Sequence, residues 1–162
     1  MFETIEEKIA KIFHKAYTNN QLYEYLTGIG EYKVVFKDSA NYDYNDMELM
    51  QKGINTYLLK NQNINLDEFL NETLMKYLKS NDIFKVNAVL DFVVYYVKYI
   101  KKDNVRFKIN LDKIIPILKE KLLLLKQMML ETSNHYNNGS NFWQGIENQC
   151  DLYEIRTGKK IL

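Results

Sequence analysis

The chain has 162 residues, of which 46% are hydrophobic and 27% are charged, with a formal net charge of +1. These values exclude a disordered chain and predict a single globular domain with a sizeable core. Cys150 is the only cysteine, which excludes an intramolecular disulfide.

The first residues, MFETIEEK, lack the basic and then apolar order of a signal peptide, and charges interrupt the apolar stretches. We therefore expect a cytoplasmic protein with no membrane partner. Lys, Asn, Ile and Tyr are abundant and share A/T-rich codons, which indicates a bacterial source with an A/T-rich genome.

The first third of the chain predicts helices over residues 3–17, 21–27 and 46–60. Apolar residues at helical spacing define the first of these, and Gly28-Ile29-Gly30 ends the second. Gly53 weakens the prediction for the third helix, because glycine is a poor helix former. Its expected buried face comprises Met47, Met50, Ile54, Tyr57 and Leu58. Tyr32, Val34 and Phe36 alternate with Lys33, Val35 and Lys37, which predicts a short strand over residues 32–36.

Residues 66–79 and 82–101 predict two further helices, capped by Asn65 and by Ser80-Asn81-Asp82. The 82–101 helix is apolar around most of its circumference, so we expect it to be the central helix. Its narrow polar stripe comprises Asn87, Asp91, Lys98 and Lys101. Asp91 needs a partner if it is covered, and an ion pair or a solvated stripe is expected there rather than a catalytic acid.

The last third predicts helices over residues 111–131 and 142–150. Pro116 predicts either a kink in the first of these or a helix start nearer residue 115. Residues 152–162 allow two readings, because Thr157-Gly158 either turns a small hairpin or follows a helix end. The expected fold is therefore mostly α, with minor β structure at 32–36 and 152–162.

A short internal repeat links two of these helices. Ile64-Asn65-Leu66-Asp67 recurs as Ile109-Asn110-Leu111-Asp112, 45 residues later, and the stripes that follow are in similar helical phase. A period near 45 resembles HEAT/armadillo-type helical repeats, over residues 64–131. That resemblance implies stacked helix pairs, and the alternative is an irregular helical bundle.

Catalytic and cofactor motifs are sparse. Neither His14 nor His135 has a second His or Cys at ligand spacing, and no nucleotide-binding or nucleophile motif occurs. Asp43-Tyr44-Asn45-Asp46 begins like a calcium loop, but Glu48 stands where such a loop needs glycine. Cys150 is expected to be an inert, covered thiol. We therefore expect no enzyme, no cofactor and no metal.

The remaining reading is a non-enzymatic module that binds another protein. In size and character it resembles small bacterial immunity proteins that neutralise a toxin partner. The alternatives are an adaptor or regulatory subunit of a larger assembly and a weak nucleic-acid binder. Residues 1–75 carry 7 Lys and 12 Asp/Glu, whereas residues 76–126 carry 12 Lys/Arg and 5 Asp/Glu, so either the halves pair or one face meets a charged partner.

The candidate partner-binding residues lie in the least regular stretch of the sequence. Tyr42 and Tyr44 are flanked by polar residues and have little reason to be buried, so they are expected as exposed anchors. Their acidic neighbours Asp38, Asp43 and Asp46 would suit a basic partner such as a toxin domain.

Overall fold

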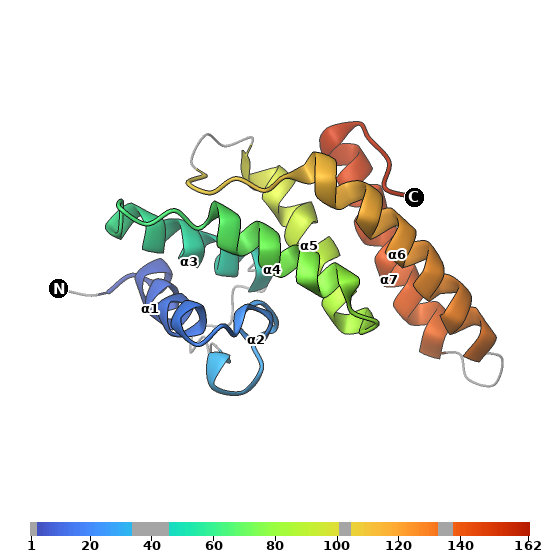
Figure 1. Ribbon diagram of the computed structural model, residues 1–162, viewed down its shortest axis with the longest axis horizontal. Helices are drawn as coiled ribbons and strands as arrows, with labels where there is room; N and C mark the ends of the chain where they lie inside the picture. The colour runs from blue at the N-terminus through green and yellow to red at the C-terminus, as the bar shows by residue number, and fades with distance from the viewer. Residues whose placement is uncertain (1–2, 34–45, 101–104, 133–137) are drawn as a thin grey trace. The chain divides into compact units, whose positions relative to one another are not determined.

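The computed structural model describes residues 3–33, 46–100, 105–132 and 138–162, and these are almost entirely helical (Figure 1). No strand occurs in these four ranges, so the mostly α prediction is confirmed. The chain divides into two compact units, each described by itself. Unit 1 comprises Met1–Phe69 and Asp103–Lys108, and unit 2 comprises Leu70–Lys102 and Ile109–Leu162.

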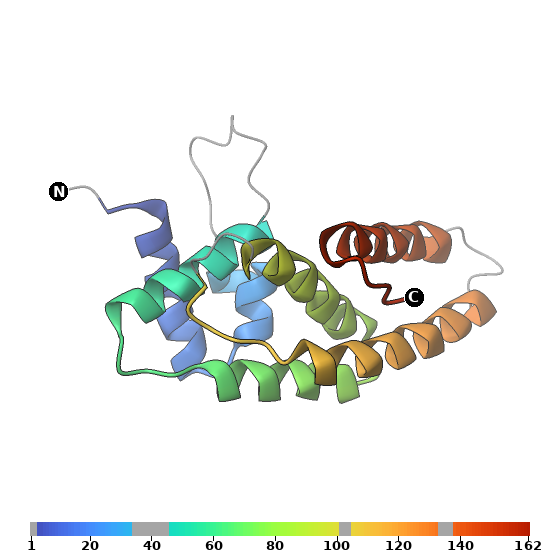
Figure 2. The same ribbon diagram turned by 90° about the horizontal axis from the view of Figure 1, so that it is seen from above.

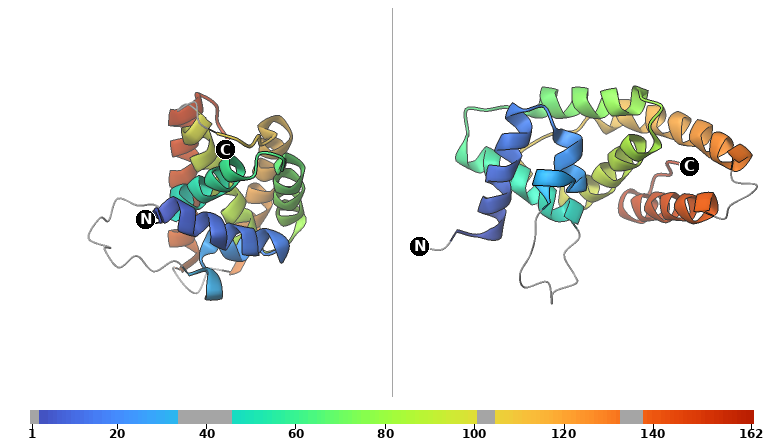
Figure 3. Two further views of the ribbon diagram at one scale, coloured as in Figure 1. Left: turned by 90° about the vertical axis from the view of Figure 1, so that its left-hand side faces the viewer. Right: turned by 90° about the horizontal axis from the view of Figure 1, so that it is seen from below.

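Unit 1 is built on three helices, α1 (Ile5–Thr18), α2 (Leu22–Thr27) and α3 (Asp46–Lys60), with a 3-10 turn η1 (Gly30–Tyr32). α1 packs against α3, and α2 lies against both (Figure 3). Thr4 caps α1 by accepting a hydrogen bond from the Glu7 backbone N–H at 3.2 Å. The predicted buried face of α3 is confirmed at every position, Met47, Met50, Ile54, Tyr57 and Leu58.

Gly53 of α3 lies directly against side chains of α1 and α2. A Cβ atom added there would lie 2.6 Å from Tyr25 Oη and 3.2 Å from Ile9 Cβ. Tyr25 is fully buried and donates its O–H to the Met50 carbonyl, one turn before Gly53, at 2.5 Å. The glycine that weakens the helix prediction is therefore the residue that lets these helices pack.

Unit 2 holds α5 (Ile83–Ile100), α6 (Leu111–Thr132), α7 (Asn138–Thr157) and most of α4 (Asp67–Lys79). α5 packs against both α6 and α7, and the latter two are antiparallel neighbours (Figure 2). Asp82 caps α5 by accepting from the Phe84 N–H at 2.9 Å. The expectation of a mostly covered helix holds, since α5 buries Val86, Ala88, Val89, Leu90, Phe92, Val93, Val94, Tyr96 and Val97.

Near the end of the chain one predicted boundary is wrong, and of the two readings of residues 152–162 the helix end is confirmed rather than the hairpin. α7 runs over Asn138–Thr157 rather than 142–150, so residues 152–157 are helical and no hairpin forms. Tyr153 is buried, and the Arg156 guanidinium donates to the Val94 carbonyl of α5 at 2.6 Å, which holds the last turn in place. Gly158 ends the helix with φ +74°, a left-handed conformation that glycine adopts readily.

The other local predictions have mixed outcomes. α6 runs through Pro116 and begins at Leu111, so a start nearer residue 115 is wrong. In the 32–36 segment, Tyr32 ends a 3-10 turn rather than beginning a strand, and residues 34–36 lie outside the described residues.

The two helices of the internal repeat bury faces that are one residue out of register. α4 buries Leu70, Leu74, Tyr77 and Leu78, whereas α6 buries Ile114, Leu118, Leu122 and Leu125. The buried positions 70, 74 and 78 correspond to 114, 118 and 122, a spacing of 44 rather than 45. The caps also differ, because Asn65 Oδ1 accepts from the N–H two residues on and Asn110 Oδ1 from the N–H three residues on. The HEAT-like resemblance stays a hypothesis.

Candidate functional site

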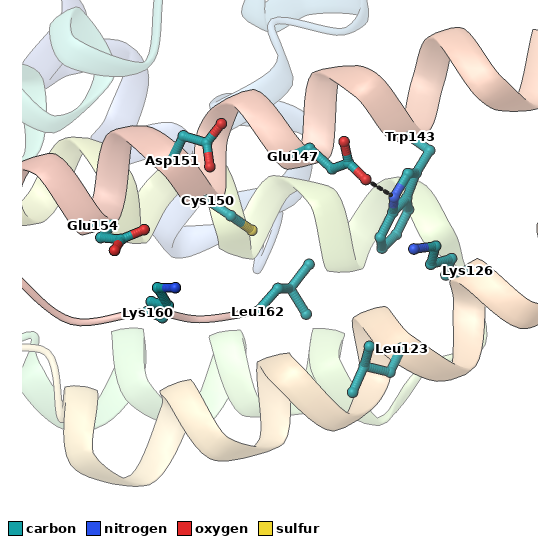
Figure 4. A pocket seen from close by; sticks show the side chains of 9 residues that line it. All are labelled: Leu123, Lys126, Trp143, Glu147, Cys150, Asp151, Glu154, Lys160 and Leu162. Carbon is teal, nitrogen blue, oxygen red and sulfur yellow. Dashed lines mark hydrogen bonds between the residues drawn. The ribbon is translucent and has the colours of Figure 1, made fainter.

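A hollow of about 260 Å³ lies in unit 2 between α6, α7 and the segment that follows α7 (Figure 4). We call this segment, residues 158–162, the return segment, and the whole depression the α6–α7 groove. The hollow is lined by Leu123, Lys126, Trp143, Glu147, Cys150, Asp151, Glu154, Lys160 and Leu162.

α7 supplies one wall of the groove through a single helical face. Positions 143, 147, 150, 151 and 154 are spaced three or four residues apart along the helix, so their side chains share a face. Three of them, Glu147, Asp151 and Glu154, form what we call the acidic wall. The wall carries three carboxylates beside an indole ring and a thiol, an unusual mixture of apolar and acidic chemistry on one surface.

Trp143 is held firmly at one end of the hollow. Only 8% of the residue is exposed, and its Nε1–H donates to Glu147 Oε1 at 2.6 Å (Figure 4). On the opposite side, Lys126 Nζ of α6 lies 5.1 Å from the ring centroid, within the range of a cation–π interaction. The indole is therefore a preorganised aromatic surface with its polar edge already satisfied.

The return segment reverses direction at Gly158 and runs back between α7 and α6 (Figure 4). The Gly158 N–H donates to the Glu154 carbonyl at 2.7 Å, and the Lys159 N–H donates to Thr157 Oγ1 at 3.1 Å. Ile161 is only 1% exposed, so it anchors the segment against the unit. Lys160 and Leu162 face the hollow.

Cys150 lies in the wall and is poorly suited to nucleophilic chemistry. Burial raises the pKa of its thiol to about 11, and the neighbouring carboxylates of Asp151 and Glu147 add to this effect. The thiol is therefore protonated at neutral pH, whereas a reactive cysteine needs a lowered pKa. This agrees with the expectation of an inert, covered cysteine.

One exposed aliphatic residue of α6, Leu123, lies in the groove. Leu123, which also lines the hollow, is 48% exposed, and the next residue, Leu124, is 49% exposed. Leu124 belongs to the second apolar stripe of this helix, with Ile117 and Met128, which sequence periodicity alone cannot assign to core or surface. Exposed aliphatic side chains beside a preorganised aromatic ring are typical of the core of a protein interface.

A second hollow, of about 280 Å³, lies in unit 1 along α1 and α3. His14, which is exposed, places Nδ1 2.9 Å from the Tyr57 hydroxyl, and burial raises the pKa of that hydroxyl. Lys60 Nζ pairs with Glu7 Oε2 at 2.6 Å, and this hydrogen bond lowers the Glu7 pKa. The polar groups that line this hollow in unit 1 already have partners within the protein. The α6–α7 groove is therefore the stronger candidate for a binding site.

Asp91 is a half-buried carboxylate of α5, and its hydrogen-bond donor is a neutral amide. Gln149 Nε2–H of α7 donates to Asp91 Oδ1 at 2.7 Å. Desolvation raises the Asp91 pKa, and the hydrogen bond from Gln149 opposes that shift. The contact ties α5 to α7 on a face of α7 other than the acidic wall, so Asp91 has a structural position.

The partner-binding residues predicted from sequence are not tested by these observations. Asp38, Tyr42, Asp43 and Tyr44 lie outside the described residues, and Asp46 begins α3 with its side chain also outside them. Sequence reasoning did not find the acidic wall of α7. The signal was the spacing of Trp143, Glu147, Asp151 and Glu154, which becomes visible only if the helix is continued beyond residue 150.

The chain is a mostly α protein, and its unit 2 carries an open, partly acidic groove. No protein-family model matches the chain, and no curated protein or solved structure is significantly similar to it. The described part of the chain brings no three His, Cys, Asp or Glu side chains together in a way that could hold a metal ion. Within that same part, each helix is too short or too polar to cross a membrane.

Proposed function

We propose that this protein is a non-catalytic module that binds another protein through the α6–α7 groove. The observation that carries the proposal is the arrangement around Trp143, a fixed and mostly covered indole next to the half-exposed Leu123. Binding energy at protein interfaces concentrates on such preorganised aromatic anchors with apolar neighbours. The Cys150 thiol is held protonated, so it does not supply a thiolate nucleophile at this surface.

The acidic wall favours a basic partner. Carboxylates along one edge of an interface attract a positively charged surface and set its orientation. The same carboxylates repel the phosphates of nucleic acid, so the groove supports a protein partner over a nucleic acid. An immunity protein that neutralises a basic toxin domain is the narrower form of this proposal, and an adaptor with a basic partner is the broader one.

Two matched variants test the proposal. Leu123 lines the groove and is 48% exposed, whereas Leu59 of α3 lies in unit 1 and is 46% exposed. Leu123→Glu places a charge in the proposed interface, and Leu59→Glu makes the same change at a matched exposed position. Both variants should fold like the parent, because both side chains are half exposed.

The parent and the two variants are immobilised and exposed to extract from the source cells, and the retained proteins are quantified by mass spectrometry. We expect at least one protein to be retained by the parent and by Leu59→Glu but lost with Leu123→Glu. That protein, purified alone, must then bind the purified parent directly. Retention of the same proteins by both variants would overturn the proposal.

A further inference from the structure

We infer that the α6–α7 groove takes an extended segment in which basic residues precede an aliphatic one, and that the return segment occupies part of this site in the free protein. The inference deepens the proposed function and rests on it, because it names the chemistry of the partner segment. It is carried by the way the chain occupies its own groove.

The return segment shows which chemistry the groove accepts. Its sequence is Gly158-Lys159-Lys160-Ile161-Leu162, two basic residues followed by two aliphatic ones. Ile161 is buried, and Lys160 lies in the hollow that the acidic wall lines (Figure 4). A partner segment with the same order can place a basic side chain along the wall and an aliphatic side chain in the Ile161 position.

The attachment of the return segment suits displacement. Its hydrogen bonds to Glu154 and Thr157 are all made by Gly158 and Lys159, next to the end of α7. Beyond Lys159, the buried side chain of Ile161 and the half-buried side chain of Leu162 hold the segment. Local opening of residues held by so few contacts costs little compared with unfolding the unit.

The groove also offers an incoming segment more surface than the return segment covers. The hollow is bounded by Leu162 but also by Leu123, Lys126 and Trp143 (Figure 4). A ligand that displaces the return segment keeps its contacts with the acidic wall and adds contacts with the indole and Leu123. An incoming segment from a partner can therefore outcompete the tethered one despite the high effective concentration of the latter.

The chain provides its own reporter for this site. Trp143 is the only tryptophan, so tryptophan emission reports on the groove alone. The probe is a synthetic peptide, Gly-Lys-Lys-Ile-Leu, acetylated and amidated at its ends, which contains no aromatic residue. Control peptides replace both lysines with Glu, or both aliphatic residues with Ser.

Three variants separate self-occupancy from simple binding. Ile161→Ser removes the buried anchor and releases the return segment. Lys160→Glu repels the segment from the acidic wall without touching the core, and Lys159→Glu is its matched control, since Lys159 is exposed and does not line the hollow. If Ile161→Ser does not fold, as judged by circular dichroism, the comparison of Lys160→Glu with Lys159→Glu alone tests whether the return segment occupies the groove.

Titration of Trp143 emission at low salt should give saturable binding of the probe peptide to every chain. If the return segment fills the site at least nine-tenths of the time, its release strengthens apparent binding by about tenfold or more. We therefore expect about tenfold tighter binding to Ile161→Ser and tighter binding to Lys160→Glu, with Lys159→Glu close to the parent. Neither control peptide should bind. Salt at 0.5 M should weaken binding of the lysine peptide, because the distance over which charges attract one another falls to roughly 3–10 Å.

Equal affinity for the parent and both releasing variants would overturn self-occupancy. No saturable binding to either releasing variant, or equal binding of the Glu peptide, would overturn the proposed partner chemistry. These failures are distinct from failure of the proposed function. If the peptide fails but capture of a partner still depends on Leu123, the groove remains the interface and only this inference falls.

Discussion

The packing of unit 1 makes a sharp prediction about Gly53. Replacing Gly53 with Ala adds one methyl group at a point 2.6 Å from Tyr25 Oη and 3.2 Å from Ile9 Cβ. Overpacking of this kind costs about 1–3 kcal/mol. Alanine favours the helix over glycine by roughly 0.8–1 kcal/mol, which offsets part of the cost. Contacts this close place the overpacking cost in the upper part of its range, about 2–3 kcal/mol, so we expect Gly53→Ala to lower the free energy of unfolding by about 1–2 kcal/mol.

Gly145 of α7 offers a matched control within the same chain. It lies inside a helix and is exposed, and a Cβ added there meets nothing within 4 Å. Gly145→Ala should therefore gain the helical preference without a clash and stabilise the protein by up to about 1 kcal/mol. The same substitution in two helices thus has opposite expected signs.

The assay is urea unfolding followed by far-UV circular dichroism, with midpoints and slopes compared among the three proteins. The variant Tyr25→Phe adds a further check. It removes the hydroxyl that the new methyl would meet, so Gly53→Ala should cost less in the Tyr25→Phe background than in the parent. A Gly53→Ala protein that is as stable as the parent, or more stable, would refute the close packing of α1 on α3.

Three further predictions concern unit 2. Asp91→Asn should raise the melting temperature at pH 7, because desolvation raises the Asp91 pKa in the folded state above its ordinary value of 3.8. The cost of ionising Asp91 is absent below that ordinary value and appears as the pH rises through the raised folded-state pKa. The gain in melting temperature should therefore vanish near pH 3. An equal gain at pH 3 and pH 7 would contradict a desolvated Asp91 carboxylate. Phe92→Ala should lose about 3–5 kcal/mol of stability, as for other fully buried phenylalanines; unfolding like the parent would mean that α5 is not the core helix. Arg156→Ala should lower the free energy of unfolding by about 1.5–3 kcal/mol, since the guanidinium donates to the Val94 carbonyl. Ile155→Ala, at a residue that is 79% exposed, should change it little. Equal losses for the two variants in urea unfolding would argue against the Arg156 contact.

The sequence predicted helices best where a strong apolar face repeats. α3 was placed at residues 46–60, and all five expected core positions are buried. Periodicity succeeds there because one face meets α1 and α2 while the other meets water. Propensity alone misjudged Gly53, because the reason for that glycine lies in another helix.

α7 shows why the end of the chain was harder to predict. Its apolar residues are sparse, so no continuous stripe marks residues 138–157 as one helix. Tertiary contacts stabilise its last turns, with Tyr153 buried and Arg156 bound to α5. Tertiary context routinely overrides local preference, and the sequence gives no sign of a partner on α5.

The candidate groove could not be predicted for the same reason. Trp143 and the whole acidic wall share a face only because α7 continues past residue 150. The return segment closes the site after Gly158, which the sequence allowed either in a hairpin turn or at a helix end. The 45-residue repeat was a partial guide. Its two asparagines mark the starts of α4 and α6 to within one residue. The buried faces nevertheless follow a spacing of 44, since packing rather than cap position decides which side of a helix is covered.

The most direct test of the groove as the binding surface is the affinity of the captured partner for two charge-reversal variants, measured by isothermal titration calorimetry. Asp151→Lys reverses an exposed carboxylate of the acidic wall, and Glu72→Lys reverses an exposed carboxylate on α4 that does not line the hollow. We expect Asp151→Lys to raise the Kd at least tenfold, about 1.4 kcal/mol, and Glu72→Lys to leave it within about twofold of the parent. Equal affinity of the partner for both variants would show that the partner binds elsewhere.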